Sequence, residues 1–172
     1  MKFIKVIFIS AVLMLSSLSS LAQDRDLWYM SGYRWNIEID AGSTLSRTFA
    51  VSASTSHGYR TGNGMYFGAG AGITFNPNDY AYVTVPIFAD WKYSFINKDC
   101  SPYLAVKVGT ELNLEDLTAG LMFKPSVGVD VGKFSIHFGY GFCNGKTSIT
   151  AIGYKEYKFT KHTFTVGASY WF

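Results

Sequence analysis

The sequence has 172 residues, of which 17% are aromatic and only 16% are charged, and it contains 17 glycines. This length corresponds to one domain, and the mix of aromatic residues and glycine favours β structure. The formal net charge is +3, but without Lys2 and Lys5, which lie in an expected signal peptide, 13 basic residues remain against 12 acidic ones. Such a balance excludes a basic protein built to bind nucleic acid.

The first 22 residues have the layout of a secretory signal peptide. A basic start, Met1–Lys5, precedes an almost wholly apolar run from Val6 to Leu15, and a serine-rich stretch then ends in Ser20-Leu21-Ala22. The apolar run is shorter than the ~20 residues of a membrane-spanning helix. We therefore predict cleavage after Ala22, which leaves residues 23–172 as one domain. The residue directly after the cleavage site is not a cysteine, so a lipoprotein anchor is not expected. No later run is long enough to cross a bilayer as a helix.

Eight segments of the mature chain alternate between large apolar residues and small or polar ones. This period of two predicts strands with one apolar and one polar face. The segments are 33–40, 49–56, 65–75, 83–95, 104–112, 121–130, 134–143 and 163–172. About ten residues suffice to cross a bilayer as a tilted strand, and an even number of strands suits antiparallel closure into a barrel.

The connections between these segments are of two kinds. Compact polar breaks at 60–64, 97–100 and 132–133 fall on alternate connections, as short periplasmic turns would. The longest connection, 144–161, would then lie outside the cell.

The alternation is compatible with two kinds of barrel, because a soluble barrel has the same period as a transmembrane barrel with its faces reversed. The interior of an eight-stranded barrel is only just wide enough for its side chains. The bulky apolar set does not fit there, whereas the small and charged set does, so we expect the bulky residues to face lipid. The aromatic residues near the ends of the apolar phase would form a girdle at the periplasmic rim; they are Tyr33, Trp35, Phe67, Trp91, Tyr93, Phe134, Tyr170 and Phe172.

The inward phase carries charges of both signs. Unpaired buried charges cost several kcal/mol each, so their near-balance predicts a salt-bridge network that plugs the lumen. An ion pathway along the same residues is the alternative. The predicted network consists of Arg34, Glu38, Asp40, Asp90, Lys92, Lys107, Glu111, Lys124 and Asp130.

Residues with catalytic chemistry are few. Gly68–Gly72 alternates glycine with alanine inside a strand, with no helix after it, so we expect its glycines to give room to long lumenal side chains rather than to bind phosphate. His57 and His162 fall on the outward phase, and His137 falls on the inward phase beside Ser135. No motif joins these groups, so we expect no catalytic residue and read His137 as a member of a polar network.

The two cysteines would lie far apart. Cys100 falls in a predicted periplasmic turn and Cys143 near the outer end of the seventh strand, whereas a disulfide needs Cα atoms within ~7 Å. We predict that they are unpaired. No cysteine and histidine residues have the spacing of a metal site, and neither a metal nor a cofactor is expected.

The last segment carries the most specific signal. Its apolar face, Phe164, Val166, Ala168, Tyr170 and Phe172, resembles the closing strand of bacterial outer-membrane β-barrels, a pattern that the assembly machinery of that family recognises. Together with the signal peptide and the eight strands, it makes residues 27–172 similar to the small eight-stranded barrels of the OmpA/OmpX-like and "porin family" type found in Bacteroidetes.

The resemblance implies an all-β, eight-stranded antiparallel transmembrane up-and-down barrel in the cell outer membrane. Its partners would be outer-membrane lipid and, during biogenesis, the barrel assembly machinery. The chain ends with the barrel, so the peptidoglycan-binding domain of full OmpA-type proteins is not expected. Three functions stay open: a structural or surface-interaction protein with a plugged lumen, a narrow channel or carrier for small solutes or lipids, and a lipid A-modifying enzyme. We expect the first, with a surface partner that the sequence does not name.

Overall fold

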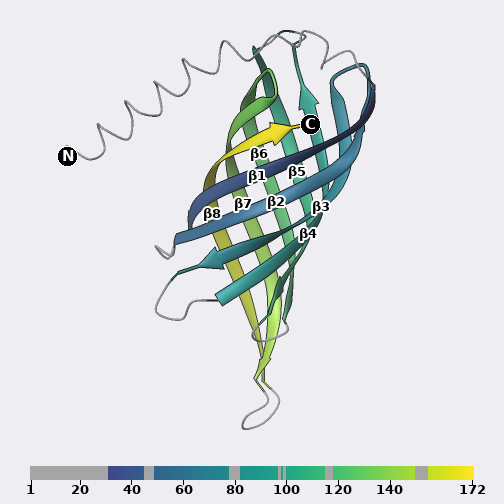
Figure 1. The fold of residues 1–172 in the computed structure, drawn as a ribbon. Coiled ribbons are helices and arrows are strands. Elements are labelled where there is room, and N and C mark those ends of the chain that lie inside the picture. Colours follow the sequence, from purple (N-terminus) through teal and green to yellow (C-terminus); the bar gives the residue numbers. More distant parts are fainter. Residues whose placement is uncertain are drawn as a thin grey trace, which may run out of the picture.

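The computed structural model describes residues 31–44, 49–77, 82–96, 98, 100–114, 118–149 and 155–172. Within these residues the chain forms eight antiparallel strands that close into one barrel (Figure 1). The strands are β1 (Gly32–Thr44), β2 (Phe49–Arg60), β3 (Met65–Asn76), β4 (Tyr82–Ser94), β5 (Cys100–Asn113), β6 (Ala119–Val131), β7 (Phe134–Ile149) and β8 (Lys155–Trp171). The predicted signal peptide, 1–22, lies outside the described residues. Among the residues described, no helix is long and apolar enough to span a membrane.

The predicted architecture is confirmed. Each strand pairs with the next along the chain, and β8 returns to pair with β1. The strands have 12 to 17 residues, more than the predicted ten, because the hydrogen-bonded ladder continues past the stretch in which large apolar residues mark the alternation.

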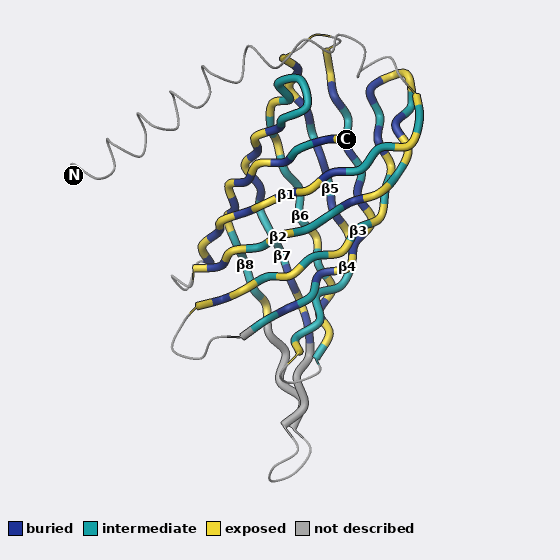
Figure 2. Tube along the Cα trace, viewed as in Figure 1, coloured by how far each residue is buried: buried dark blue, intermediate teal, exposed yellow. Residues whose placement is uncertain are grey.

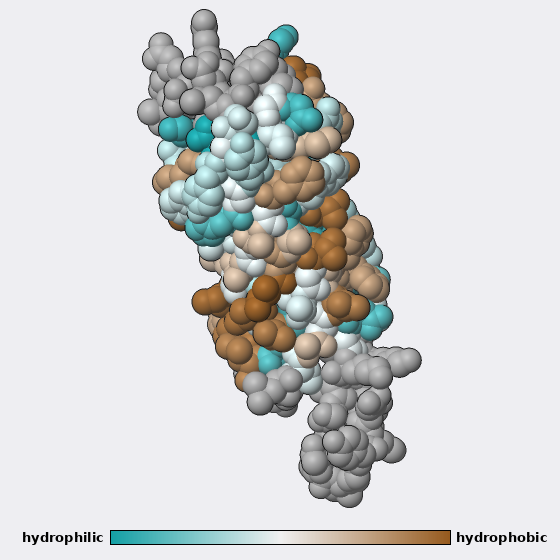
Figure 3. Space-filling view, turned by 90° about the vertical axis from the view of Figure 1, so that its right-hand side faces the viewer, coloured by the Kyte–Doolittle hydropathy of each residue, from teal (hydrophilic) through white to brown (hydrophobic). Residues whose placement is uncertain are grey.

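The two faces of the barrel are the reverse of those in a soluble protein. Burial alternates along each strand (Figure 2), and the exposed set is the large apolar one: Ile39 is 59% exposed, whereas its neighbour Asp40 is 3% exposed. Figure 3 shows apolar side chains, in brown, gathered over the middle and lower part of one face. Monomeric soluble proteins rarely expose so much contiguous apolar surface. The polar interior and apolar exterior are therefore arranged as the sequence predicts.

The compact turns lie at one end of the barrel. In the β2–β3 turn the Thr61 amide donates to the Met65 carbonyl at 2.8 Å, and Gly64 has a φ of 83° that favours glycine. Two residues assigned to turns from the sequence belong to strands instead: Arg60 ends β2 and Cys100 begins β5. Both residues continue the backbone pairing of their strands. The sequence does not show this, because the residues around them are polar like those of a turn.

The prediction of a long connection over 144–161 is wrong. β7 runs to Ile149 and β8 begins at Lys155, and these two residues pair across the hairpin. The β7–β8 ribbon extends past the other strands at the lower end of Figure 1. The segment is rich in β-branched and aromatic residues, which suit strands, but large apolar residues no longer alternate with polar ones there, so the period-of-two signal is lost.

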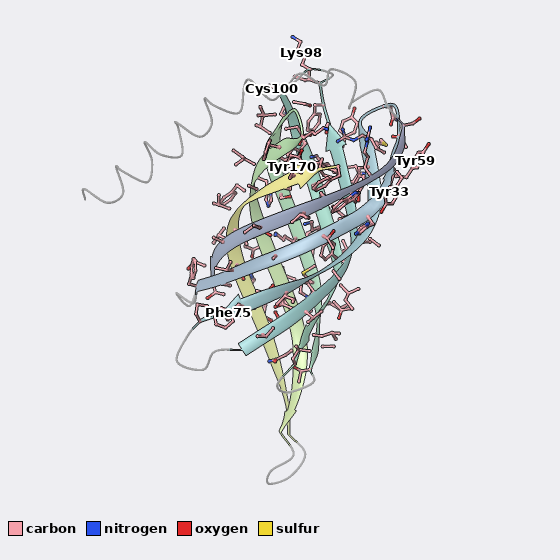
Figure 4. All side chains as sticks on the ribbon, in the orientation of Figure 1. Tyr33, Tyr59, Phe75, Lys98, Cys100 and Tyr170 are labelled. Atoms are coloured by element: carbon pink, nitrogen blue, oxygen red, sulfur yellow. The ribbon has the colours of Figure 1, made fainter. Side chains whose placement is uncertain are left out.

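Aromatic rings gather at the end of the barrel where the compact turns lie. Trp35 of β1 stacks on Phe172, with ring centroids 3.9 Å apart, and Tyr170 contacts both Phe172 and Phe134, at 4.7 and 4.8 Å. Tyr33 and Tyr59 point away from the barrel at the same end (Figure 4). These contacts join strands β1, β7 and β8 on the outer surface.

Candidate functional site in the barrel lumen

Four charged side chains meet in the middle of the lumen. Lys107 Nζ of β5 lies 2.5 Å from Glu38 Oε1 of β1, and Lys124 Nζ of β6 lies 2.6 Å from Asp40 Oδ2 and 3.6 Å from Glu38 Oε1. Strand β1 pairs only with β2 and β8, so these ion pairs cross the lumen rather than join neighbouring strands. Side chains from opposite walls thus meet on the barrel axis.

Asp40 is also held by His137. Nε2 of His137 donates to Asp40 Oδ1 at 2.7 Å. The two residues lie on either side of β8, where Gly167 pairs with both of them. A Cβ at Gly167 would lie 2.7 Å from the His137 ring and would also collide with Asp40. The hydrogen bond therefore passes over a strand at the one position where that strand has no side chain.

A second cluster lies nearer the end with the compact turns. Lys92 Nζ is 2.5 Å from Asp130 Oδ1, and the same ammonium group lies over the rings of Tyr103 and Trp171, 3.8 and 4.5 Å from their centroids. Asp130 also accepts a hydrogen bond from Ser135, and the Trp171 indole donates to Ser135 at 3.0 Å. Lys92 is thus enclosed by a carboxylate and two aromatic faces, a favourable setting for a desolvated cation.

The lumen also contains large aromatic residues, of which the alternation in the sequence already places Tyr66, Phe88 and Trp171 on the inward phase. Tyr66, Phe88, Tyr103 and Trp171 point inward and are buried. They fit because glycines on adjacent strands leave room: a Cβ at Gly70 would lie 2.8 Å from the Phe88 ring. The description of the inward phase as small and charged is therefore incomplete. The glycines of β3 have the role of spacers for long lumenal side chains.

Two predicted network members have other surroundings. Among the described residues no carboxylate lies within 4.0 Å of Arg34, and its Nε has no hydrogen-bond partner there. Asp90 is buried opposite Lys107 in the β4–β5 register, and within the described residues it forms no ion pair within 4.0 Å. Arg60, assigned to a turn from the sequence, is instead a buried lumenal cation that lies over the Trp171 ring.

A cavity of about 90 Å³ occupies the half of the lumen toward the β7–β8 hairpin. Lys107 and Lys124 lie at its deep end, and Glu111 and Lys161, whose charged atoms are 3.6 Å apart, line its outer part. Sequence reasoning placed Lys161 in a loop. Counting back in steps of two from Thr165 would have placed it on the inward phase of β8.

The central cluster contains groups of the kind that bind metals, and two lysines share them. Glu38, Asp40 and His137 bring three ligand atoms within 4.8 Å of one another, but the ammonium groups of Lys107 and Lys124 already contact both carboxylates and would repel a metal cation. Within the described part of the chain, Nδ1 of His137 has no hydrogen-bond partner. Among the described residues, no hydroxyl or thiol is therefore hydrogen-bonded to this nitrogen.

The apolar face of the last strand lies on the outside of the barrel. Phe164 and Val166 of β8 are exposed, and so is Phe172, which directly follows Trp171, the last residue of the strand. Ala168 and Tyr170 lie on the same face, since the buried residues of the strand are those between them. The structure places all five residues of the predicted assembly signal on one outward stripe.

The closed ladder, polar lumen and apolar outer face define the fold as that of eight-stranded transmembrane β-barrels. Among solved structures, the chain is similar to the outer membrane enzyme PagL, with a TM-score of 0.62 and 11% identity over 78% of this chain and 98% of that one. It is also similar to a de novo designed transmembrane β-barrel (TM-score 0.55, 15% identity, 81% and 95% covered). A third is the N-terminal β-barrel domain of Pseudomonas aeruginosa OprF (TM-score 0.50, 11% identity, 83% and 100% covered).

These similarities are similarities of fold. No protein-family model matches the chain, and no curated protein matches its sequence. Membership of the OmpA/OmpX-like or Bacteroidetes-type family stays a prediction from the sequence.

Proposed function

We propose that the protein is an integral outer-membrane β-barrel with a closed lumen, which acts as a structural or surface-interaction protein. The observation that carries this proposal is the reversed burial, with large apolar residues outside and paired charges inside. In water the exposed face would be unstable, whereas in a bilayer it is the favoured surface. The fold shared with outer-membrane barrels supports the same location.

The lumenal contacts support a closed barrel rather than a pore. Lys107 reaches Glu38 across the axis, and Lys92 is enclosed by Asp130 and two aromatic rings. A permeating ion would have to break such pairs, and breaking each pair leaves a buried charge uncompensated. A narrow carrier for small solutes is the second candidate, favoured by the cavity in the other half of the lumen. A lipid A-modifying enzyme is disfavoured because His137 has no nucleophile beside it among the described residues.

We assign the end with the compact turns to the periplasm and the β7–β8 ribbon to the cell exterior. Short turns on the periplasmic side and longer loops outside are the usual arrangement in such barrels. The projecting ribbon then offers a surface for an extracellular partner or for the outer leaflet.

Two measurements test the proposal. The folded protein, extracted from outer membranes, should migrate faster on a detergent gel when unheated than when boiled, because the closed barrel resists detergent. In planar bilayers the refolded protein should conduct negligible current. Recovery in the soluble fraction would refute the location, and a steady ion-selective conductance changed by Lys107→Met would favour a channel.

A further inference from the structure

The cavity in the hairpin half of the lumen has features of a binding site that the closed-barrel proposal does not use. Its walls are largely apolar, formed by Ala50, Pro86, Phe88 and Met122, and Lys107 and Lys124 lie at its deep end. Glu111 and Lys161 at the other end are partly exposed, so the cavity is accessible from the hairpin side. A concave apolar site with a few converging polar groups is the usual form of a small-molecule site.

The hydrogen-bonding groups at the deep end are not fully used. An ammonium group has three N–H donors, but among the described residues Lys107 and Lys124 each donate to only one carboxylate oxygen. Thr165 lines the cavity and is 8% exposed, and its Oγ1 has no hydrogen-bond partner in the described structure. These N–H and O–H groups can donate to an acceptor that enters the cavity, such as a carboxylate.

The charges set a limit on the ligand. Three lysines line the cavity, Lys107, Lys124 and Lys161, against the two acids Asp40 and Glu111. Glu38 lies behind this layer and pairs with Lys107. With Glu38 counted, three lysines face three acids, so the site carries no excess positive charge before a ligand enters. A monoanion changes this balance less than a dianion such as phosphate, which would also leave the apolar walls without contacts.

We propose that this cavity binds short-chain monocarboxylates. The carboxylate would accept hydrogen bonds from Lys107, Lys124 and Thr165, and the hydrocarbon part would contact Phe88 and Met122. A volume of about 90 Å³ is smaller than the ~150 Å³ of a cavity that holds benzene. The enclosed part of the ligand is therefore the carboxylate with two or three carbons, and a longer chain would extend toward the hairpin end.

The first test uses propionate as the probe. The refolded protein in zwitterionic micelles is titrated by calorimetry with propionate, with neutral 1-propanol and propylammonium of the same size, and with inorganic phosphate. Propionate should bind saturably with a Kd of about 1 mM, in the range that so few atoms reach. The other three should bind at least ten-fold more weakly. Equal affinity for propionate and 1-propanol, or no saturable binding of propionate, would refute the proposal.

The second test locates the site with matched variants. Ala50→Leu fills the cavity and should weaken propionate binding at least ten-fold, whereas Ala53→Leu makes the same change on the outward face of β2 and should leave the affinity unchanged. Thr165→Val removes the hydroxyl at nearly constant shape and should weaken binding about five-fold, and Thr165→Ser should restore it. Heat-dependent mobility on a gel verifies that each variant folds. Should Ala50→Leu fail to fold, the Thr165 pair decides, and unchanged binding in Thr165→Val would count against the assignment.

Discussion

Trp35 and Phe172 stack across the seam between the first and last strands, with ring centroids 3.9 Å apart and planes inclined by only 6°. The backbone joins them as well, because the Phe172 amide donates to the Trp35 carbonyl at 2.9 Å. Phe172 therefore contributes directly to barrel closure, in addition to any role as an assembly signal.

Deleting Phe172 separates these two roles. The loss of one aromatic contact should cost about 1.5–3 kcal/mol, which a barrel of this size survives, so folding in detergent should reach nearly wild-type yield. In cells we expect little protein in the outer membrane, because the machinery would no longer recognise the last strand. Phe123→Ala removes an outward ring from β6, which does not pair with β8, and should assemble normally. Normal assembly of the deletion in cells, with poor folding in detergent, would make Phe172 a packing residue only.

Lys107→Met tests the central ion pairs. The substitution leaves Glu38 buried without its closest cation, and we expect the free energy of unfolding to fall by about 3–5 kcal/mol in urea titrations. The exposed Lys98→Met should change it by less than about 0.5 kcal/mol. Adding Glu38→Gln to Lys107→Met should recover part of the loss. Equal effects of Lys107→Met and Lys98→Met would mean that the lumen is wet and the pair contributes little.

Gly167→Ala should be destabilising because the new Cβ would collide with the Asp40–His137 pair. We expect a loss of about 1–3 kcal/mol, typical of overpacking in a filled interior. Gly141→Ala is the matched control, since a Cβ there would lie 3.6 Å from its nearest neighbour, an ordinary contact. The same unfolding titration compares them. Similar stabilities of the two variants would show that His137 and Asp40 separate readily.

The two cysteines should differ in reactivity. Both are free thiols, and Cys100 is exposed whereas Cys143 is buried. A maleimide added to the folded protein in micelles should modify Cys100 alone, and Cys143 should react only after boiling in detergent. The folded Cys100→Ser variant should therefore remain unlabelled, as mass spectrometry would verify. Rapid labelling of that variant would mean that the lumen admits the reagent.

Lysine labelling on intact cells tests the proposed orientation. Lys98, in the β4–β5 turn, is exposed at the end assigned to the periplasm, and Lys133 lies in the β6–β7 turn. Lys146, Lys155 and Lys158 belong to the β7–β8 ribbon, and their side chains lie outside the described structure. An impermeant amine reagent should modify only the ribbon lysines. Modification of Lys98 or Lys133 in intact cells would reverse the assignment.

The period of two in the sequence was enough to predict the eight strands and the direction of their faces, because each strand carries that information locally. It placed Glu38, Asp40, Lys107 and Lys124 inward without knowledge of their partners. The partners depend on register: His137 meets Asp40, 97 positions away, only because both strands align on Gly167. For the same reason the alternation could place Phe88 inward but could not show the space that accommodates it, which comes from Gly70 on another strand.

Lys161 was missed for a different reason. Around it, polar residues occupy both phases of the strand, so no contrast between large apolar and polar residues marks the alternation. Backbone pairing with β7 continues regardless, because hydrogen bonds between strands do not require a difference between the two faces.

The two ladders of β8 are very unequal in length. It forms sixteen residue pairs with β7 but only nine with β1. The long ladder is a hairpin between neighbours in the chain, whereas the short one joins residues as distant as Asn36 and Trp171. Closing so long a segment of chain carries the larger entropy cost, and distant pairings form slowly. A β7–β8 hairpin that forms early would thus serve as a template onto which β6 and its predecessors add, and the seam at Trp35 and Phe172 would be the last ladder to form and the first to open.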